Sequence, residues 1–211
     1  MRLTIFGASG GTGTHLVRHA LAGGHQVTAV VRDPARLAIP AHPGLHVITA
    51  DIMDPASILP AVTGADAVLT AAGPHGAGPS TVITDSVRSI AAAMDKAGTR
   101  RLLALSGSIA ADGGEGLFLR YLLKPLARRT FLRHVCADMR HAEAEVAGTD
   151  LDWTIVRPPR LTNGPVTGKY RTAAERDLPR GFQVSRADLA NYMLSLISDG
   201  ATVRKHVAIA Y

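Results

Sequence analysis

Short apolar runs alternate with amphipathic stretches along most of the chain. An apolar run of about four to eight residues is typical of a buried strand, and apolar residues three and four positions apart indicate a helix. The pattern predicts strands near residues 2–6, 26–31, 45–49, 66–71, 101–105, 152–157 and 205–210, and helices near 12–23, 55–62, 80–97, 138–147 and 186–198. Because strands that alternate with helices build a parallel sheet covered on both faces, we expect an α/β fold with a doubly wound parallel sheet.

Two segments break this alternation. Residues 107–137 follow the fifth predicted strand, and residues 158–184, rich in Pro, Gly, Thr and Arg, follow the sixth. In an open α/β sheet, ligands bind beyond the carboxyl ends of the strands. Since both segments leave the sheet at those ends, we expect them to form walls of a substrate site.

The first predicted strand leads through a glycine-rich turn into the first predicted helix. Gly7, Gly10 and Gly13 have the spacing G-x-x-G-x-x-G, a variant of the dinucleotide fingerprint. The first glycine turns the chain, the second lets the backbone approach a phosphate, and the third lets the helix pack closely. Backbone N–H groups and the positive end of the helix dipole then meet where a pyrophosphate can bind. We therefore expect a three-layer α/β/α Rossmann fold with a nucleotide cofactor. The cofactor-binding residues predicted in this turn are Gly7, Ser9, Gly10, Gly11, Thr12 and Gly13.

The end of the second predicted strand selects between nicotinamide cofactors. An acidic residue there binds the ribose 2′-hydroxyl, whereas an arginine accommodates a 2′-phosphate. Here Arg32 follows the strand, with Asp33 next to it and Arg36 one turn later. A guanidinium can hold phosphate with two hydrogen bonds, so this pattern favours NADPH. The alternative is that Arg32 and Asp33 form an exposed ion pair of little energetic consequence.

Residues after the third and fourth predicted strands complete the expected cofactor site. Asp51 and Ile52 are placed to flank the adenine, although Asp51 is equally consistent with a helix cap near Asp54. Small residues end the fourth strand and leave room for the ribose and phosphates, or simply pack closely. These small residues are Ala71, Ala72 and Gly73.

Composition narrows the class of protein. The 211 residues favour one domain over residues 1–211, and the hydrophobic content of 46% argues against disorder. Cys136 is the only cysteine, so we expect no internal disulfide, no cysteine-based metal site and a cytoplasmic location. No apolar run is long enough to span a membrane. The net charge of +6 suits anionic ligands, and the absence of nucleic-acid-binding motifs makes a nucleic-acid partner unexpected.

Taken in order, these motifs resemble the NAD(P)H-binding group of the atypical short-chain dehydrogenases/reductases. This group contains flavin reductase (NADPH), also called biliverdin reductase B, and regulators of fungal nitrogen metabolite repression. The resemblance rests on residues 4–13, 27–33, 51–52, 66–68, 91–94 and 151–159. It implies a Rossmann fold and NADPH binding, with the glycine loop at Gly7, Gly10 and Gly13 and the 2′-phosphate arginine at Arg32. It is less specific for the reaction, because the group holds both reductases and redox sensors.

The resemblance also implies residues near the nicotinamide. The flavin reductase has a serine after the fifth strand, and the corresponding position falls on Gly107, so the candidates are Ser106 and Ser108 on either side. Ser106 is expected to contact the cofactor as well. After the sixth strand the reductase has two prolines and a histidine. Here Pro158, predicted to contact the cofactor, and Pro159 are followed by Arg160, which we expect to act on the acceptor.

The Tyr-x-x-x-Lys pair that transfers a proton in many short-chain dehydrogenases is absent from its usual place. Tyr121 and Lys124 have the wrong spacing, and neither Tyr170 nor Tyr192 has a lysine four residues later. Alcohol–ketone chemistry is therefore disfavoured. Hydride transfer to a flavin or quinone demands less, because the conjugated acceptor takes the hydride and solvent can supply the proton. The prediction is an NADPH-dependent reductase of a small planar acceptor such as a flavin or quinone. The alternative is a non-catalytic NADP(H) sensor that acts through a protein partner.

Residues 117–134 carry arginines and a lysine at helical spacing among leucines. This pattern indicates a surface helix that packs its leucines, with a lid, a membrane-surface contact or an oligomer contact as alternatives. The sequence does not set the oligomeric state. His134, His141 and Glu143 lack metal spacing, so no metal is expected, and His75 is interpreted as a loop residue.

Overall fold

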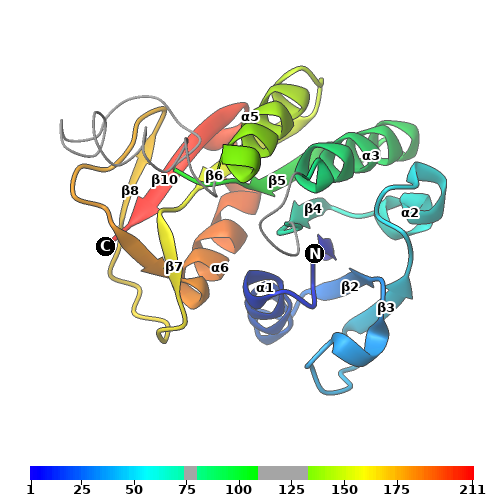
Figure 1. Ribbon diagram of the computed structural model, residues 1–211. Helices are drawn as coiled ribbons and strands as arrows, with labels where there is room; N and C mark the ends of the chain where they lie inside the picture. Colours follow the sequence, from blue (N-terminus) through cyan, green and yellow to red (C-terminus); the bar gives the residue numbers. More distant parts are fainter. Residues whose placement is uncertain (74–79, 109–132) are drawn as a thin grey trace.

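The computed structural model describes residues 1–73, 80–108 and 133–211, and these build a mostly parallel sheet between two layers of helices (Figure 1). The sheet has the strand order β3-β2-β1-β4-β5-β6-β10-β8 in the described residues. Its strands are β1 (Arg2–Phe6), β2 (Gln26–Val31), β3 (Leu45–Thr49), β4 (Ala67–Thr70), β5 (Arg101–Leu105), β6 (Asp152–Arg157), β8 (Arg171–Ala174) and β10 (Lys205–Ala210). The predicted doubly wound Rossmann fold is confirmed.

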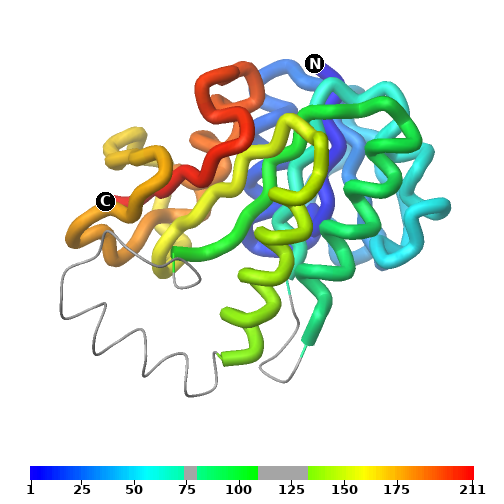
Figure 2. Tube along the Cα trace, turned by 90° about the horizontal axis from the view of Figure 1, so that it is seen from above, coloured from blue at the N-terminus to red at the C-terminus, as the bar shows by residue number. Residues whose placement is uncertain are grey.

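The helices divide between the two faces of the sheet. They are α1 (Gly11–Ala22), α2 (Pro55–Val62), α3 (Val82–Ala97), α5 (Arg133–Ala147) and α6 (Arg186–Ser195). Helices α1 and α6 pack on each other over one face, and α3 packs between α2 and α5 over the other, where α3 and α5 run side by side (Figure 2). Each face has its own apolar core, with Leu16 and Leu189 in one and Ile90 and Trp153 in the other. The central strands of the sheet are thus buried on both sides, as is typical of parallel sheets, whereas the edge strands β3 and β8 are partly exposed.

The segment 158–184 differs from the prediction. It was expected to be irregular, but it contains three short strands: β7 (Arg160–Thr162), β8 and β9 (Gln183–Ser185). β7 and β9 form a separate parallel pair, whereas β8 lies antiparallel to β10 at the edge of the main sheet. Three- and four-residue strands are too short to show an alternation in the sequence, which explains the missed prediction.

Helix α5 begins earlier than predicted. The periodicity indicated a start near residue 138, but the structure describes helix from Arg133. Asp138 is therefore inside α5, where its buried carboxylate accepts hydrogen bonds from the N–H groups of Ile83 and Thr84 at 3.0 and 2.9 Å and from the Thr84 hydroxyl at 2.6 Å. A carboxylate on one helix thus caps the amino end of another and joins α3 to α5.

The loop before α6 is organised by a second buried carboxylate, Asp188. It accepts hydrogen bonds from the N–H and hydroxyl of Thr167, the N–H of Gly168 and the hydroxyl of Tyr211. Burial raises the pKa of this carboxyl, but these hydrogen bonds outweigh burial and hold the pKa at about 2. The charged carboxylate therefore ties the loop and Tyr211 to α6.

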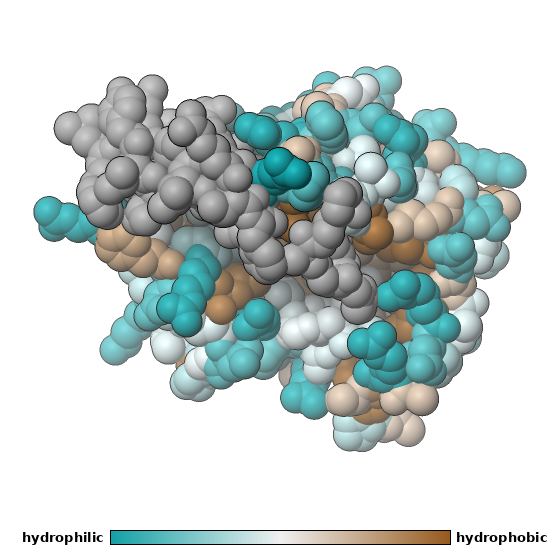
Figure 3. All heavy atoms as spheres, viewed as in Figure 1, coloured by the Kyte–Doolittle hydropathy of each residue, from teal (hydrophilic) through white to brown (hydrophobic). Residues whose placement is uncertain are grey.

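The surface of the fold is mixed. On the face in Figure 3, hydrophilic side chains cover most of the periphery, and the hydrophobic patches are small and interrupted by polar ones. In the described ranges, no helix is both long and apolar enough to cross a membrane.

Candidate functional site

A cavity of about 730 Å³ opens at the carboxyl ends of the first strands. β1 lies between β2 and β4, so the connection from β1 runs to one side of the sheet and the connections after β4 run to the other. Open α/β sheets bind ligands at this point, where the strand order reverses. The lining residues predicted from the sequence are Gly7, Ser9, Gly10, Gly11, Thr12, Arg32, Asp51, Ile52, Ala71, Ala72, Gly73 and Ser106. The structure thus gathers most of the predicted cofactor residues in one place.

The glycine loop needs its outer glycines for geometry. Gly7 has a φ of +71°, and a Cβ there would stand 2.7 Å from the carbonyl carbon of Ala71. A Cβ on Gly13, which does not line the cavity, would stand 2.0 Å from the carbonyl oxygen of Gly7. Gly7 thus lets the turn pack against the end of β4, and Gly13 lets α1 pack against the turn. At Gly10 a Cβ would meet only the Gly7 carbonyl oxygen, at 3.2 Å, and otherwise project into open space.

The amino end of α1 offers donors that no side chain caps. Gly10 occupies the cap position without a side-chain hydrogen bond, and the first turn holds no acidic residue. The first N–H groups of α2, α3 and α6, in contrast, donate to the side-chain oxygens of Asp54, Asp138 and Ser185. Because the first N–H groups of a helix have no partner within it, this end of α1 attracts an anion.

Two arginines line the cavity beyond β2. Asp33 accepts a hydrogen bond from the Ala35 N–H at 3.0 Å and so caps a 3₁₀ turn over Pro34–Arg36. This turn brings Arg36 to the same cavity as Arg32. Asp33 thus has a structural role. The cavity has two guanidinium groups after β2, where dinucleotide-binding α/β folds place the residue that contacts the ribose.

Asp51 and Ile52 follow β3 and line the same end of the cavity. The carboxylate of Asp51 accepts from the Met53 N–H at 2.9 Å, whereas Asp54 accepts from the Ala56 N–H and caps α2. The helix cap considered for Asp51 therefore belongs to Asp54, and Asp51 stays exposed at the cavity.

Ser106 stands at the far end of the cavity, directly after β5. Its hydroxyl is buried and has no hydrogen-bond partner in the described residues, whereas its N–H donates to the Val156 carbonyl at 2.9 Å. Leu105, Ile83, Met139 and other apolar residues surround it. Since a buried polar atom without a partner is costly, this hydroxyl is placed to bond a ligand.

The other residues predicted near the nicotinamide lie outside the cavity lining. The Ser108 N–H donates to the carbonyl of buried Pro158 at 2.8 Å, which ties the ends of β5 and β6 together. Arg160 is exposed at the start of β7. His75 and residues 109–132, which include most of the segments 107–137 and 117–134, lie outside the described residues.

Sequence reasoning missed one charged residue of the cavity, Arg186. It begins α6, and α6 packs on α1, which brings the side chain to the glycine loop. Burial, together with the charges of Arg18 and Arg186, lowers the pKa of His15 in the first turns of α1. His15 is therefore mostly neutral at pH 7. It does not line the cavity, whose cationic side chains among the described residues are Arg32, Arg36 and Arg186.

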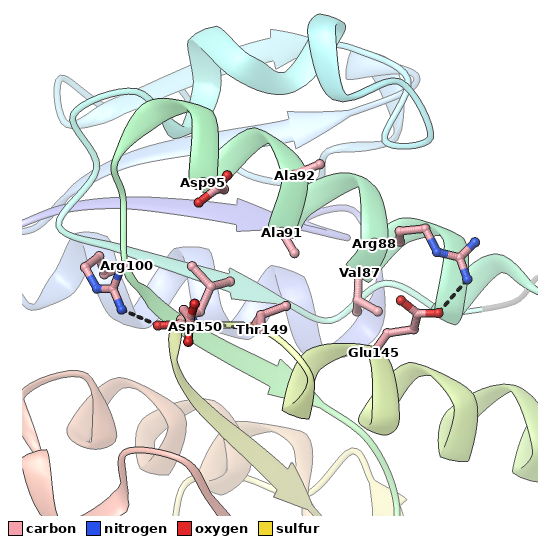
Figure 4. A pocket seen from close by; sticks show the side chains of 10 residues that line it. Val87, Arg88, Ala91, Ala92, Asp95, Arg100, Glu145, Thr149 and Asp150 are labelled. Atoms are coloured by element: carbon pink, nitrogen blue, oxygen red, sulfur yellow. Dashed lines mark hydrogen bonds and ion pairs between the residues drawn. The ribbon is translucent and has the colours of Figure 1, made fainter.

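A second hollow, of about 330 Å³, lies between α3 and α5 (Figure 4). Both of its arginines already have partners: Arg88 pairs with Glu145 at 2.7 Å, and Arg100 donates to the Asp150 carbonyl. Arg100, Thr149 and Asp150 precede β5 and β6, so the hollow reaches the opposite edge of the sheet from the glycine loop. The cavity at the carboxyl edge is therefore the stronger candidate site. No cluster of metal-ligating side chains occurs in the part of the chain that the structure describes.

Comparison with known proteins agrees with this geometry. A family model described as NAD(P)H-binding matches residues 7–200. The UPF0659 protein YMR090W of Saccharomyces cerevisiae is 28% identical over 158 residues, which is 72% of this chain and 65% of the relative. The chain thus matches slightly less than two thirds of the length of that yeast protein.

Solved structures cover the whole chain. A Burkholderia pseudomallei protein, named as a candidate exported protein, is 27% identical with a TM-score of 0.83 and full coverage of both chains. ChuY, an anaerobilin reductase from Escherichia coli O157:H7, is 25% identical with a TM-score of 0.80, covering 100% of this chain and 97% of ChuY. A short-chain dehydrogenase/reductase from Veillonella parvula in complex with NADP shares the fold, with 20% identity, a TM-score of 0.80 and coverage of 100% and 94%.

Proposed function

Because the chain belongs to this NAD(P)H-binding family, we propose that it is an NADPH-dependent reductase that transfers hydride to a flavin, a quinone or a similar planar acceptor. One observation carries the proposal. The buried Ser106 hydroxyl has no partner in the described residues and lies in the same cavity as the glycine loop and Arg32. A dinucleotide that extends from Arg32 past the loop would bring its nicotinamide toward this hydroxyl.

The residues present fit NADPH. The uncapped end of α1 and the open space at Gly10 suit a pyrophosphate, and Arg32 and Arg36 suit a 2′-phosphate. Ile52 offers an apolar surface to the adenine, with Asp51 beside it as a hydrogen-bond acceptor. The bound cofactor supplies the hydride.

The protein itself has the task of positioning. The Ser106 hydroxyl would bond the nicotinamide end of the cofactor. Ser106 itself is held in place by the hydrogen bond from its N–H to the Val156 carbonyl. Ile83 and Met139 exclude water around it. A planar acceptor needs no strongly acidic side chain, because its conjugated system takes the hydride and solvent can supply the proton.

We propose that the acceptor enters from the side of the segment 158–184. This segment presents the exposed cation Arg160 in β7 and the exposed ring of Phe182, which precedes its partner strand β9. A cation and an aromatic ring suit a flat acceptor with an anionic group. ChuY, which is named as an anaerobilin reductase and so reduces a tetrapyrrole, supports testing acceptors of that class as well.

Steady-state oxidation of NADPH, followed at 340 nm, tests the proposal with FMN, riboflavin, a neutral quinone and a linear tetrapyrrole as acceptors. We expect acceptor-dependent oxidation with at least one of them. Ser106→Ala should lower kcat/KM only modestly, since a positioned general acid would contribute about 100- to 10,000-fold. Arg160→Ala should raise KM for FMN and spare the neutral quinone, because the guanidinium bonds the phosphate of FMN.

The absence of acceptor-dependent oxidation across this panel would contradict the proposal. The non-catalytic NADP(H) sensor would then be the better reading, and NADPH should change the affinity for a protein partner.

A further inference from the structure

We infer that Arg186 binds the pyrophosphate of the dinucleotide together with the amino end of α1. The inference rests on the proposed function, because it deepens the assignment of the same cavity. It adds a binding residue from the last helix of the fold, which the glycine motif and the ribose-reading position do not include.

Arg186 lies directly against the glycine loop. A Cβ built on Gly11 would stand 2.9 Å from the Arg186 Nε and 3.1 Å from its Cδ. Gly11 is the first residue of α1, so the guanidinium lies beside the uncapped N–H groups of the first turn. The missing side chain of Gly11 thus makes room for a cation at the place where the helix attracts an anion.

The guanidinium is held but not neutralised. One of its terminal nitrogens, Nη1, donates to the side-chain oxygen of Asn163 at 2.7 Å. Asn163 is a neutral acceptor, and no carboxylate forms an ion pair with Arg186 among the residues that the structure describes. An arginine has five N–H donors, so most of them remain available to an anionic ligand.

The position of Arg186 indicates that it binds the pyrophosphate and not the 2′-phosphate. The 2′-phosphate is assigned to the residues after β2, where Arg32 and Arg36 line the cavity. Arg186 instead lies beside Gly11 at the start of α1, where the first N–H groups of a helix are oriented to bind a phosphate. NADPH and NADH share the pyrophosphate, so Arg186 should serve both cofactors, whereas Arg32 should serve only NADPH.

Calorimetry with four ligands tests whether Arg186 binds the pyrophosphate and Arg32 the 2′-phosphate. NADPH, NADH and ADP contain a pyrophosphate, whereas adenosine 2′-monophosphate contains only the 2′-phosphate. Arg186→Gln should weaken NADPH, NADH and ADP by about 10- to 100-fold each and leave adenosine 2′-monophosphate unchanged, because the variant loses hydrogen bonds to a charged group. Arg32→Ala should give the opposite pattern, with weaker NADPH and adenosine 2′-monophosphate and unchanged NADH and ADP.

Matched variants separate this effect from general loss of charge or of structure. Arg176→Gln removes an exposed arginine that does not line the cavity, and it should leave all four affinities unchanged. Asn163→Ala keeps the cation but removes its tether, so it should weaken NADPH and NADH equally and by less than Arg186→Gln. Circular dichroism checks the fold of each variant, and Asn163→Ala decides the matter if Arg186→Gln does not fold.

The outcomes for the two proposals are distinct. Unchanged NADPH and NADH affinities in a folded Arg186→Gln variant overturn the inference, as does a loss confined to NADPH. Wild-type protein that binds NADPH tightly but reduces no acceptor overturns the proposed reaction and leaves the role of Arg186 standing. Wild-type protein that binds none of the four ligands overturns both.

Discussion

At the scale of single residues, we expect the choice between NADPH and NADH to depend on Arg32. Replacing Arg32 with Ala should cost about 1.5–3 kcal/mol of NADPH binding free energy, the range for hydrogen bonds to a charged group. The affinity for NADH should stay nearly the same, because NADH has no 2′-phosphate. Calorimetry with both cofactors measures the difference, and an equal loss for the two would refute the assignment of Arg32 to the 2′-phosphate.

Gly10 differs from its neighbouring glycines in what a side chain would meet. Gly10→Val should abolish dinucleotide binding and leave a folded protein, because its Cβ would contact only the Gly7 oxygen on the protein side and otherwise fill the cavity mouth. The control is Gly200→Val, since nothing lies within 4 Å of a Cβ at Gly200. Fluorescence titration with NADPH and circular dichroism together decide the result. Wild-type affinity in a Gly10→Val protein would show that the loop does not hold the phosphates.

The sequence predicted the residues that follow strands, and it missed those brought in by helix packing. Arg32 and Asp51 come directly after apolar runs, so their place at the carboxyl edge followed from the alternation of strands and helices. The sequence placed Arg186 only at the start of the predicted helix near 186–198. Its contact with Gly11 depends on the packing of α6 against α1, and no local pattern encodes which helices become neighbours.

At the scale of elements, α3 and α5 depend on the carboxylate of Asp138. Asp138→Ala should lower the free energy of unfolding by about 2–3 kcal/mol, since it leaves buried N–H groups of Ile83 and Thr84 without an acceptor. Thr81→Ala is the matched control, because Thr81 occupies the cap position of α3 but makes no side-chain cap bond. Its exposed hydroxyl donates only to the Asp85 carboxylate, at 2.6 Å, so the change should cost no more than about 1 kcal/mol. Urea denaturation of both variants measures the contrast, and similar values for the two would contradict the cross-helix cap.

The loop before α6 should show a pH dependence that comes from Asp188. Its pKa of about 2 is below the ordinary value of 3.8, so its contribution to stability is present above pH 4 and is lost as the pH falls through 2. Asp188→Asn should cost about 2 kcal/mol at pH 7, and the difference from wild type should shrink toward pH 2.

Denaturation of the Asp188 variant and wild type at pH 7, 4 and 2.5 tests this expectation. The exposed Asp95→Asn on α3 serves as control and should change stability by no more than about 0.5 kcal/mol. A difference for Asp188→Asn that stayed constant down to pH 2.5 would mean that the charge of the carboxylate does not stabilise the loop.

Ser185 followed three residues later by Asp188 is a pattern typical of a helix start, but it describes only part of the hydrogen bonding in this loop. The Ser185 hydroxyl accepts from the Asp188 N–H at 3.0 Å, as a helix start of this kind predicts. The carboxylate of Asp188, however, turns to the loop, and the N–H of Ser185 donates to the Tyr211 hydroxyl instead. Partners 20 or more residues away in the sequence cannot be identified from a four-residue motif.

At the scale of the whole molecule, the cavity is assembled from segments that are far apart along the chain. Gly7 belongs to the first strand–helix turn, Ser106 follows β5, and Arg186 begins the last long helix. The alternation of strands and helices predicted this convergence for the early strands. The β7–β9 pair and the antiparallel β8 were not predictable, because each strand is too short to leave a pattern.

Because the cavity is lined by residues from both ends of the sequence, a dinucleotide bound there would hold the amino-terminal and carboxyl-terminal halves of the chain together. A ligand held at both Gly11 and Arg186 opposes any opening that separates α1 from α6, and at 100 times its Kd it stabilises the closed state against such opening by about 2.7 kcal/mol. Limited proteolysis should therefore slow throughout the described fold when NADPH is added, in the amino-terminal and carboxyl-terminal halves alike. In a cell, the supply of this cofactor would then influence the lifetime of the protein against proteases.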